Sequence, residues 1–477
     1  MQHVAATRDG NSWLSHFRAS LALGIPLIGA QLAQLGIHTT DVVILGRLGA
    51  AHLAAIVLSG QFFFTIFIFG SGFATAVIPM VAQAYGRGDA TSVRRSVRMG
   101  MWVVLIYSVL MVPVFYSAEH ILLFAGQKPE VAALAGEYLA IAQWGLPPAL
   151  LFMTLRGLVS AHGRAGIILY LTLVILILNA VFAYALVLGH FGFPALGMIG
   201  AAIVSAAVNA LSFVLMVIYI QRRPELRRYE LFVRFWRADW PAFFEVVHLG
   251  LPISFTVLAE VSLFTVASLL MGIIGTIELA AHGIALQLAS VAFMIPYGLA
   301  QAATVRVGVA HGRGDHLGLV RASWAVLILA SSMAIVGGLL FALAPKTLAG
   351  IFLDREGKDS LAVLAYAGPL VVIAGIFQLV DGLQAIAAGL LRGLKDTRIP
   401  MILALISYWP IGFFCAWVLA FPAGLGGIGV WLGFLSGLAA AAVLLNWRFF
   451  RLVAKEARSV RTPVESERQV PQYFSGH

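Results

Sequence analysis

Long apolar stretches, separated by short polar loops, are the feature that most constrains how this chain can fold. Each stretch has about 20 to 30 residues, which is enough to cross a hydrocarbon core of about 30 Å as a helix. Twelve of them can be counted, at residues 19–46, 52–84, 97–117, 132–155, 166–189, 196–220, 244–272, 278–307, 322–343, 363–391, 399–420 and 427–450. The sequence therefore predicts an all-α integral membrane protein with twelve transmembrane helices.

Composition excludes a soluble globular protein. Only 11% of the 477 residues are charged and 61% are hydrophobic, whereas soluble domains have about 25% charged residues. The first apolar stretch is too long for the core of a signal peptide, so we expect it to be retained as a membrane helix. The single cysteine, Cys415, excludes a disulfide within the chain, and we expect it to serve packing alone.

The distribution of basic residues predicts the orientation in the membrane. If both termini are cytoplasmic, only five of the 31 Lys and Arg residues lie outside, namely Arg47, Lys128, Lys346, Arg355 and Lys358. This bias is the one that the positive-inside rule describes. The net charge of +10 is then spread over cytoplasmic loops, where it would meet anionic lipid headgroups rather than nucleic acid.

The chain contains an internal duplication, which appears when its first helices are compared with the residues 226 positions later. The matches include Gly24 with Gly250, Pro26 with Pro252, Gln61 with Gln287, Gly72 with Gly298, and residues 86–89 with 312–315. Each half has an even number of spans, so a pseudo-two-fold axis along the membrane normal should relate two six-helix bundles. Pro26 and Pro252 bend equivalent helices, either as hinges or as passive kinks.

The predicted organisation has five parts. They are a cytoplasmic N-terminal segment (1–18), an N-terminal six-helix lobe (19–220), a cytoplasmic linker (221–243), a C-terminal six-helix lobe (244–450) and a cytoplasmic tail (451–477). The tail is polar and has no hydrophobic periodicity, so we expect it to be disordered. In transporters built from such repeats, the substrate binds between the repeats near the middle of the bilayer.

Three acidic residues lie well inside the predicted helices, at Asp41, Glu260 and Asp381. A charged group costs about 2.5 to 3.5 kcal/mol at a helix centre, so such residues usually serve an ion or substrate path, a proton relay or a structural pair. No Lys or Arg lies deep enough in the predicted helices to pair with them. An unpaired carboxylate in an apolar medium takes up a proton or attracts a cation, and both are transport chemistry. For Asp41, an interfacial position is the alternative.

Uncharged polar residues cluster near the same helices, and include Gln34 and Thr40 in the first, Asn179 in the fifth, Gln287 in the eighth and Gln378 in the tenth. Under the duplication, Gln34 occupies the position of Glu260. These side chains would either support a binding site or merely join helices by hydrogen bonds.

Several motifs carry no catalytic meaning in this context. Residues 424–429 match a dinucleotide-binding pattern but follow no strand, and the Arg-Gly-Asp triplets at 87–89 and 313–315 are interpreted as cytoplasmic turns whose Asp caps a helix. The sequence has no phosphate-binding GxxxxGK[ST] loop. We therefore expect an ion gradient as the energy source, and no cofactor.

Longer segments give the chain a family resemblance. They are TTDVVILGRLG (39–49), AYGRGD (84–89), AHGRGD (310–315), LILNAVFAY (176–184), LAEVSLF (258–264) and FQLVDGLQAIAAGLLRGLKDTRIPM (377–401). With them the chain resembles the multidrug and toxic compound extrusion (MATE) family, in particular its NorM-like bacterial branch, over about residues 15–450. The resemblance implies an antiporter of the bacterial inner membrane that exports cationic, often aromatic compounds in exchange for Na⁺ or H⁺.

The resemblance also implies site residues. Asp41, Asn179, Glu260 and Asp381 fall on the family's cation and substrate positions. Several NorM-like members have a tyrosine where this chain has Phe377, and a phenyl ring attracts a cation but offers no hydroxyl. The coupling ion and the lobe that binds it are therefore open, and Na⁺ would bind at the second-lobe carboxylates.

Two other functions are alternatives. A flippase for a lipid-linked or amphipathic solute would need a cationic central cavity to meet phosphate, and the absence of deep Lys or Arg argues against it. A membrane-embedded lipid-modifying enzyme would need a carboxylate-rich metal motif or a nucleophile beside a base, and neither is found. The expected partners are small organic cations and membrane lipid, with no obligate protein partner.

Overall fold

The computed structural model describes residues 12–353 and 359–466, and within these ranges every regular element is a helix. Twelve helices are long and apolar enough to span a membrane, as the sequence predicts. Those of the first half are α1 (Trp13–Leu45), α2 (Ala50–Gly86), α3 (Ala90–Tyr116), α5 (Pro129–Ala142) continued by α6 (Leu146–Ala161), α7 (Ala165–Leu188) and α8 (Gly197–Arg222).

The second half repeats this arrangement with one irregular helix. Its regular members are α10 (Trp240–Ile274), α11 (Thr276–Arg313), α12 (His316–Leu343), α14 (Ser360–Gly393) and α17 (Gly426–Ser466). The irregular helix lies between α14 and α17 and has three segments, which are α15 (Arg398–Ile406), the π-helical η4 (Ser407–Phe413) and α16 (Phe414–Ala420). Short helices α4 (Ala118–Phe124), α9 (Pro224–Arg227) and α13 (Pro345–Gly350) lie in the connections.

The two Arg-Gly-Asp turns begin helices, as predicted. Asp89 accepts a hydrogen bond from the backbone N–H three residues later at 3.0 Å, and Asp315 does the same at 2.8 Å. Each carboxylate therefore caps the first turn of its helix, α3 or α12. Gly88 and Gly314 have left-handed backbones, with φ of 74° and 69°, which allows the chain to turn sharply between the two helices.

Among the described residues, the first half packs around one large apolar cluster and the second half around two, and residues at the lobe contact add to a cluster of the other half. In the first half α2 packs against α3 and α6, and α1 packs against α7. In the second half α11 packs against α12 and α14, and α14 packs against α17. We call the two packed groups the N-lobe (α1 to α8) and the C-lobe (α10 to α17).

The lobes meet through reciprocal contacts that follow the duplication. Helix α1 packs against α11, and α2 packs against α10. A Cβ at Gly72 would lie 2.5 Å from the backbone nitrogen of Ser254, and one at the equivalent Gly298 would lie 2.7 Å from that of Ile28. Ile28 and Ser254 are themselves equivalent residues. Both crossings exclude a side chain, and such matched pairs are what a two-fold relation between the lobes produces.

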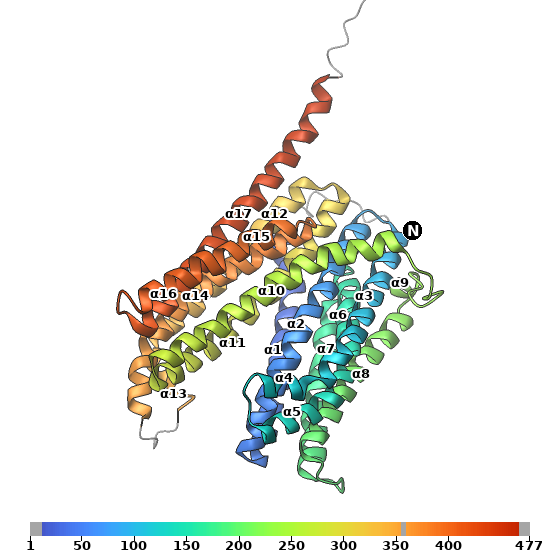
Figure 1. Ribbon diagram of the computed structural model, residues 1–477. Coiled ribbons are helices and arrows are strands. Elements are labelled where there is room, and N and C mark those ends of the chain that lie inside the picture. Colours follow the sequence, from blue (N-terminus) through green and yellow to red (C-terminus); the bar gives the residue numbers. More distant parts are fainter. Residues whose placement is uncertain (1–11, 354–358, 467–477) are drawn as a thin grey trace, which may run out of the picture.

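The lobes are in contact at one end and diverge toward the other (Figure 1). The contact end carries the start of α1, and α17 extends past the bundle on the same side (Figure 1). The short helices α4 and α13 lie at the diverging end, in separate lobes (Figure 1). If the termini are cytoplasmic, as the basic residues predict, the lobes are closed against each other on the cytoplasmic side.

Helix α17 continues to Ser466, so the prediction of a disordered tail from residue 451 is wrong over this part. Lys455 and Glu456 favour helix, and Glu456 also lies 3.7 Å from His311 of α11, so the helix gains a neighbour beyond the membrane span. The rest of the tail lies outside the described residues. So do residues 1–11 of the N-terminal segment, and the predicted outer-loop cations Arg355 and Lys358.

Candidate functional site

The N-lobe brings two predicted residues into contact. Asn179 of α7 donates a hydrogen bond from Nδ2 to Oδ1 of Asp41 on α1, at 2.7 Å. Asn179 is completely buried, whereas Asp41 is partly exposed. The hydroxyl of Thr40 instead bonds to the carbonyl oxygen of Gly36 in its own helix, at 2.8 Å. The N-lobe site therefore consists of one carboxylate held by one amide.

The C-lobe brings the other two predicted carboxylates together. Asp381 of α14 is only 4% exposed and interacts electrostatically with Glu260 of α10. Gln384, one turn after Asp381, hydrogen-bonds to Glu260 and donates from Nε2 to the hydroxyl of Tyr408 at 2.5 Å. Two carboxylates that share a buried site repel each other when both are charged, and a proton or a metal cation relieves that repulsion. The positive charge of Arg392, in the last turn of α14, also acts on Glu260.

The C-lobe site also contains acceptor atoms without partners. Within the described part of the chain, Oδ1 of Asp381 and Oε1 of Gln384 are buried and accept no hydrogen bond. Buried unpaired oxygens are costly, and hard cations bind to carboxylate, amide and hydroxyl oxygens. No group of three His, Cys, Asp or Glu residues lies together in the same described ranges. A Na⁺ ion at Glu260 and Asp381 would therefore need amide, hydroxyl or backbone oxygens as further ligands.

Other predicted residues lie in the interior of the C-lobe. Phe377 is 2% exposed, with its ring 6.0 Å from that of Phe264 and 5.4 Å from that of Trp431. Gln378 is also buried and lies against the glycine pair 337–338 of α12. We therefore expect Phe377 to shape the site by packing.

The remaining predicted polar residues are exposed on their helices. They are Gln34 on α1 and Gln287 on α11. A polar side chain facing lipid is costly, so exposure within a membrane span favours a position on the surface between the lobes. Pro26 and Pro252 lie inside α1 and α10, which continue through both residues. Their role as hinges stays a prediction.

Sequence reasoning missed Tyr408. This tyrosine lies in the π-helical η4, which also contains Pro410, and is completely buried. Short π-helical segments widen a helix locally and occur often at functional sites. The signal in the sequence is a proline two residues after a tyrosine in an otherwise apolar span. This pattern predicts an irregular helical turn, but it does not predict which residue bonds to the tyrosine.

The sequence-based statement that no Lys or Arg lies deep in a helix is wrong for two arginines. Arg156 of α6 is 7% exposed and donates to Oε1 of Gln301 on α11 at 3.0 Å. Arg306 of α11 donates to the carbonyl oxygen of His16 at 2.7 Å and also bonds to the hydroxyl of Ser20. The prediction ended the fourth span at residue 155 and the eighth at residue 307, so it placed Arg156 just outside a span and Arg306 at the end of one. Both arginines join one lobe to the other.

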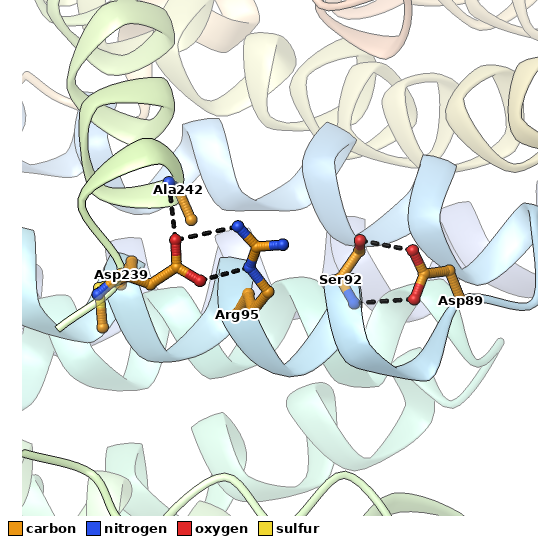
Figure 2. Close-up of polar contacts among 6 residues, drawn as sticks. Asp89, Ser92, Arg95, Asp239 and Ala242 are labelled. Atoms are coloured by element: carbon orange, nitrogen blue, oxygen red, sulfur yellow. Dashed lines mark hydrogen bonds and ion pairs between the residues drawn. The ribbon is translucent and has the colours of Figure 1, made fainter. Parts of the chain in front are cut away.

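A further contact between the lobes lies outside the membrane span. Asp239 precedes α10 and accepts hydrogen bonds from Nε and Nη2 of Arg95 on α3, the latter at 3.0 Å, and from the N–H of Ala242 at 3.3 Å (Figure 2). The bond from the guanidinium holds the pKa of Asp239 below its usual range. This carboxylate thus caps α10 and ties it to the N-lobe.

Comparison with known proteins agrees with this architecture. A model of the MatE family matches residues 26–185 and 252–418. The chain is 70% identical to a probable multidrug resistance protein NorM of Rhizobium meliloti (strain 1021), over 95% of this chain and 98% of that protein. It is 66% identical to the protein of the same name from Agrobacterium fabrum, over 94% and 97% of the two chains.

Solved structures share the fold. The crystal structure of the eukaryotic MATE transporter AtDTX14 matches with a TM-score of 0.83 at 21% identity, over 95% of this chain and 99% of that one. At this identity the likeness concerns the arrangement of helices. The family match covers most of both lobes, and the relatives are similar over nearly their whole length. The chain therefore belongs to the MatE family.

Proposed function

We propose that this chain is a multidrug efflux antiporter, which exports organic cations in exchange for Na⁺ or H⁺. Its similarity to proteins named multidrug resistance protein NorM supports export. The observation that carries the proposal is the C-lobe site, where two carboxylates share an apolar site and where buried acceptor oxygens have no partner among the described residues. Such a site changes its affinity for cations when its surroundings change.

Coupling follows from competition between a cation and the drug. An antiporter must bind the ion more tightly in one conformation and the drug more tightly in the other, because a ligand shifts an equilibrium only by its difference in affinity. Negative charge at the carboxylates attracts an organic cation, and a bound Na⁺ or proton cancels that charge. The ion therefore weakens drug binding in the conformation that releases the drug to the outside.

The free oxygens favour Na⁺ as the coupling ion. Oδ1 of Asp381 and Oε1 of Gln384 are acceptors, and the hydroxyl of Tyr408 offers a further oxygen. A proton supplies a single O–H donor, which makes one hydrogen bond, whereas a Na⁺ ion contacts several oxygens at once. Proton coupling is the alternative that the experiment below distinguishes.

Movement of the lobes would expose the site alternately. In the present conformation α1, α2, α10 and α11 are in contact near the termini, with no space for a side chain at Gly72 or Gly298. Rocking of one lobe against the other would separate these surfaces and open the cytoplasmic side. Arg156, which is buried, and Arg306, which is partly buried, bond across this contact, so they do not provide the free central cations that a flippase for phosphate-bearing lipids would need.

Ethidium efflux tests the proposal. Bacteria that lack their own drug pumps and express this chain would be loaded with ethidium and given either a sodium pulse or an imposed pH gradient. We expect sodium to start efflux and the variant Glu260→Gln/Asp381→Asn to abolish it. Efflux driven only by the pH gradient would show that H⁺, and not Na⁺, is the coupling ion. No efflux under either condition would reject drug export and favour a flippase.

A further inference from the structure

A cavity of about 670 Å³ lies at the contact end of the molecule, away from the carboxylates. Three arginines line it, each from a different part of the chain. Arg87 follows α2 of the N-lobe, Arg313 ends α11 of the C-lobe, and Arg228 belongs to the linker between the lobes. The cavity is therefore shared by both lobes, and its positive charge is highest when the two lobes are in contact.

The arginines are available to a ligand. Arg87 and Arg313 are exposed, and neither side chain makes a salt bridge or a hydrogen bond with another described residue. Arg228 donates to the hydroxyl of Tyr229 at 2.9 Å, and its guanidinium lies 5.0 Å from the centre of that ring. Guanidinium groups bind phosphate through paired hydrogen bonds, so three of them around one cavity favour a phosphate ligand.

One acidic residue, Asp89, also lines the cavity, but its carboxylate is occupied. It accepts hydrogen bonds from the N–H of Ser92 at 3.0 Å and from the hydroxyl of the same residue at 2.5 Å (Figure 2). These bonds hold the pKa of Asp89 below its usual range, so it stays ionised as the cap of α3. Against this single negative charge, three arginines leave the cavity net positive.

The walls of the cavity are held in place from both sides. The ring of Tyr85 lies 4.4 Å from that of His162, whose Nε2 is 2.9 Å from the hydroxyl of Tyr229. Across the cavity the backbones at the ends of α2 and α11 are in contact. They are so close that a Cβ at Gly312 would clash with the carbonyl oxygen of Gln83. A ligand would thus meet a preformed site in this conformation, which lowers the cost of binding.

We propose that this cavity binds a phosphate-bearing anion that bridges Arg87, Arg228 and Arg313 and stabilises the conformation in which the lobes meet at this end. The anion is either the headgroup of an acidic lipid or a soluble phosphate. When the lobes separate, Arg313 moves away from Arg87 and the site loses a charge. The anion therefore binds more tightly to the closed end and shifts the equilibrium toward it. The anion does not share residues with the proposed drug site, and the two ligands affect each other only through the lobe equilibrium.

The test measures binding to the purified full-length protein in dodecyl maltoside micelles. Short-chain phosphatidylglycerol, short-chain phosphatidylcholine and inorganic pyrophosphate would each be titrated while thermal stability is followed. The variant is Arg87→Ala/Arg228→Ala/Arg313→Ala. The matched control, Arg222→Ala/Arg227→Ala/Arg237→Ala, removes three exposed arginines of the same face that do not line the cavity.

We expect phosphatidylglycerol or pyrophosphate to bind the wild type, and the cavity variant to bind at least about tenfold more weakly, since each basic residue near an anionic surface contributes about 1 kcal/mol. The control should stay within about twofold of the wild type. Stabilisation by phosphatidylglycerol alone identifies a lipid headgroup, and stabilisation by pyrophosphate alone identifies a soluble anion. Equal losses in both variants, or no preference of the wild type for either anion over phosphatidylcholine, would overturn the proposal.

A second measurement tests the link to the lobes. Thr91 and Leu317 are exposed, equivalent residues in the two lobes, so spin labels at these positions in a Cys415→Ala background report the separation of the contact end. The bound anion should increase the share of short distances in the wild type. It should leave the distribution of the cavity variant unchanged. A change of equal size in the cavity variant would contradict the bridging role of the arginines.

Discussion

The two lobes share a duplicated scaffold but differ at their carboxylates. In the N-lobe, Asp41 is partly exposed and accepts a hydrogen bond from a buried amide. In the C-lobe, Asp381 is buried beside Glu260, and acceptor oxygens at this site have no partner in the described ranges. Oδ1 of Asn179 is also buried without a partner in the described ranges, so an unpaired amide oxygen occurs in both lobes. The difference is the charge, because the C-lobe site holds two interacting carboxylates and the N-lobe site holds one.

The duplication makes this difference informative. At the contact between the lobes, equivalent residues such as Gly72 and Gly298 still perform the same task. At the carboxylates, the position of Glu260 is occupied by Gln34 in the N-lobe, and that of Asp41 by the buried Ala267 in the C-lobe. The lobes have kept the geometry of their contact and have diverged in chemistry. We therefore expect the C-lobe to bind the coupling ion and the N-lobe to contact the drug.

The largest effect should come from the C-lobe carboxylates. Each hydrogen bond or contact of a charged group contributes about 1.5 to 3 kcal/mol, so losing two should reduce coupled efflux at least about 100-fold. Binding of radioactive Na⁺ to purified Glu260→Gln/Asp381→Asn protein should be lost, while Asp41→Asn should still bind the ion. The opposite pattern in the two variants would assign the ion to the N-lobe.

The arginines that join the lobes should come next. Arg306→Ala removes bonds to both His16 and Ser20, whereas Arg156→Ala removes one bond to Gln301. We expect the first to shift the lobe equilibrium toward separation by about 10- to 100-fold and the second by about tenfold. Distances between spin labels in the two lobes measure this shift. Equal effects would mean that the number of bonds across the contact does not decide its strength.

Asn179→Leu tests the N-lobe site alone. The substitution leaves Asp41 without its amide donor, at a cost of about 1 to 3 kcal/mol. If Asp41 contacts the drug, the KM for ethidium should change by about tenfold, with the sodium dependence unaltered. Asn179→Gln serves as the control that keeps an amide. A change in sodium dependence instead of KM would show that the lobes do not divide the two tasks.

Tyr408→Phe should have a moderate effect confined to the ion. The variant keeps the ring but removes the hydroxyl that accepts from Gln384, which costs about 0.5 to 1.5 kcal/mol. We expect Na⁺ to bind about three- to tenfold more weakly, with the KM for ethidium unchanged. Weakened ethidium binding at normal sodium affinity would move Tyr408 from the ion site to the drug site.

The smallest effect should come from Asp239. Its pKa is held low by the bond from Arg95, so the ionised carboxylate stabilises the fold above the ordinary Asp pKa of about 3.9, and this contribution is lost as the pH falls through the lower folded value. Because the pair is partly exposed, Asp239→Asn should cost less than about 1 kcal/mol at pH 7. Thermal unfolding from pH 7 down to pH 3 measures the difference. An undiminished difference at the acid end would exclude this ion pair as its cause.

Much of the candidate site could be predicted from the sequence because charge is rare in apolar helices. Asp41, Glu260 and Asp381 are conspicuous for this reason alone, and the structure pairs each with a polar neighbour. Tyr408 could not be found in this way, because a tyrosine is ordinary in a membrane helix and its role depends on Gln384 of another helix. Arg156 was misplaced because its burial results from the other lobe, which no local pattern reveals.

The sequence by itself determined the twelve spans and the division into two related halves, and its basic loops predict the orientation in the membrane. Hydrophobicity and charge are properties of a single segment, and repetition appears when two segments are aligned, so all three can be found in one sequence. Only the tertiary structure decided that Asn179 meets Asp41, that Gln384 joins Glu260 to Tyr408, and that three distant arginines share one cavity. These contacts join helices far apart in the chain, and their geometry is set by how helices cross.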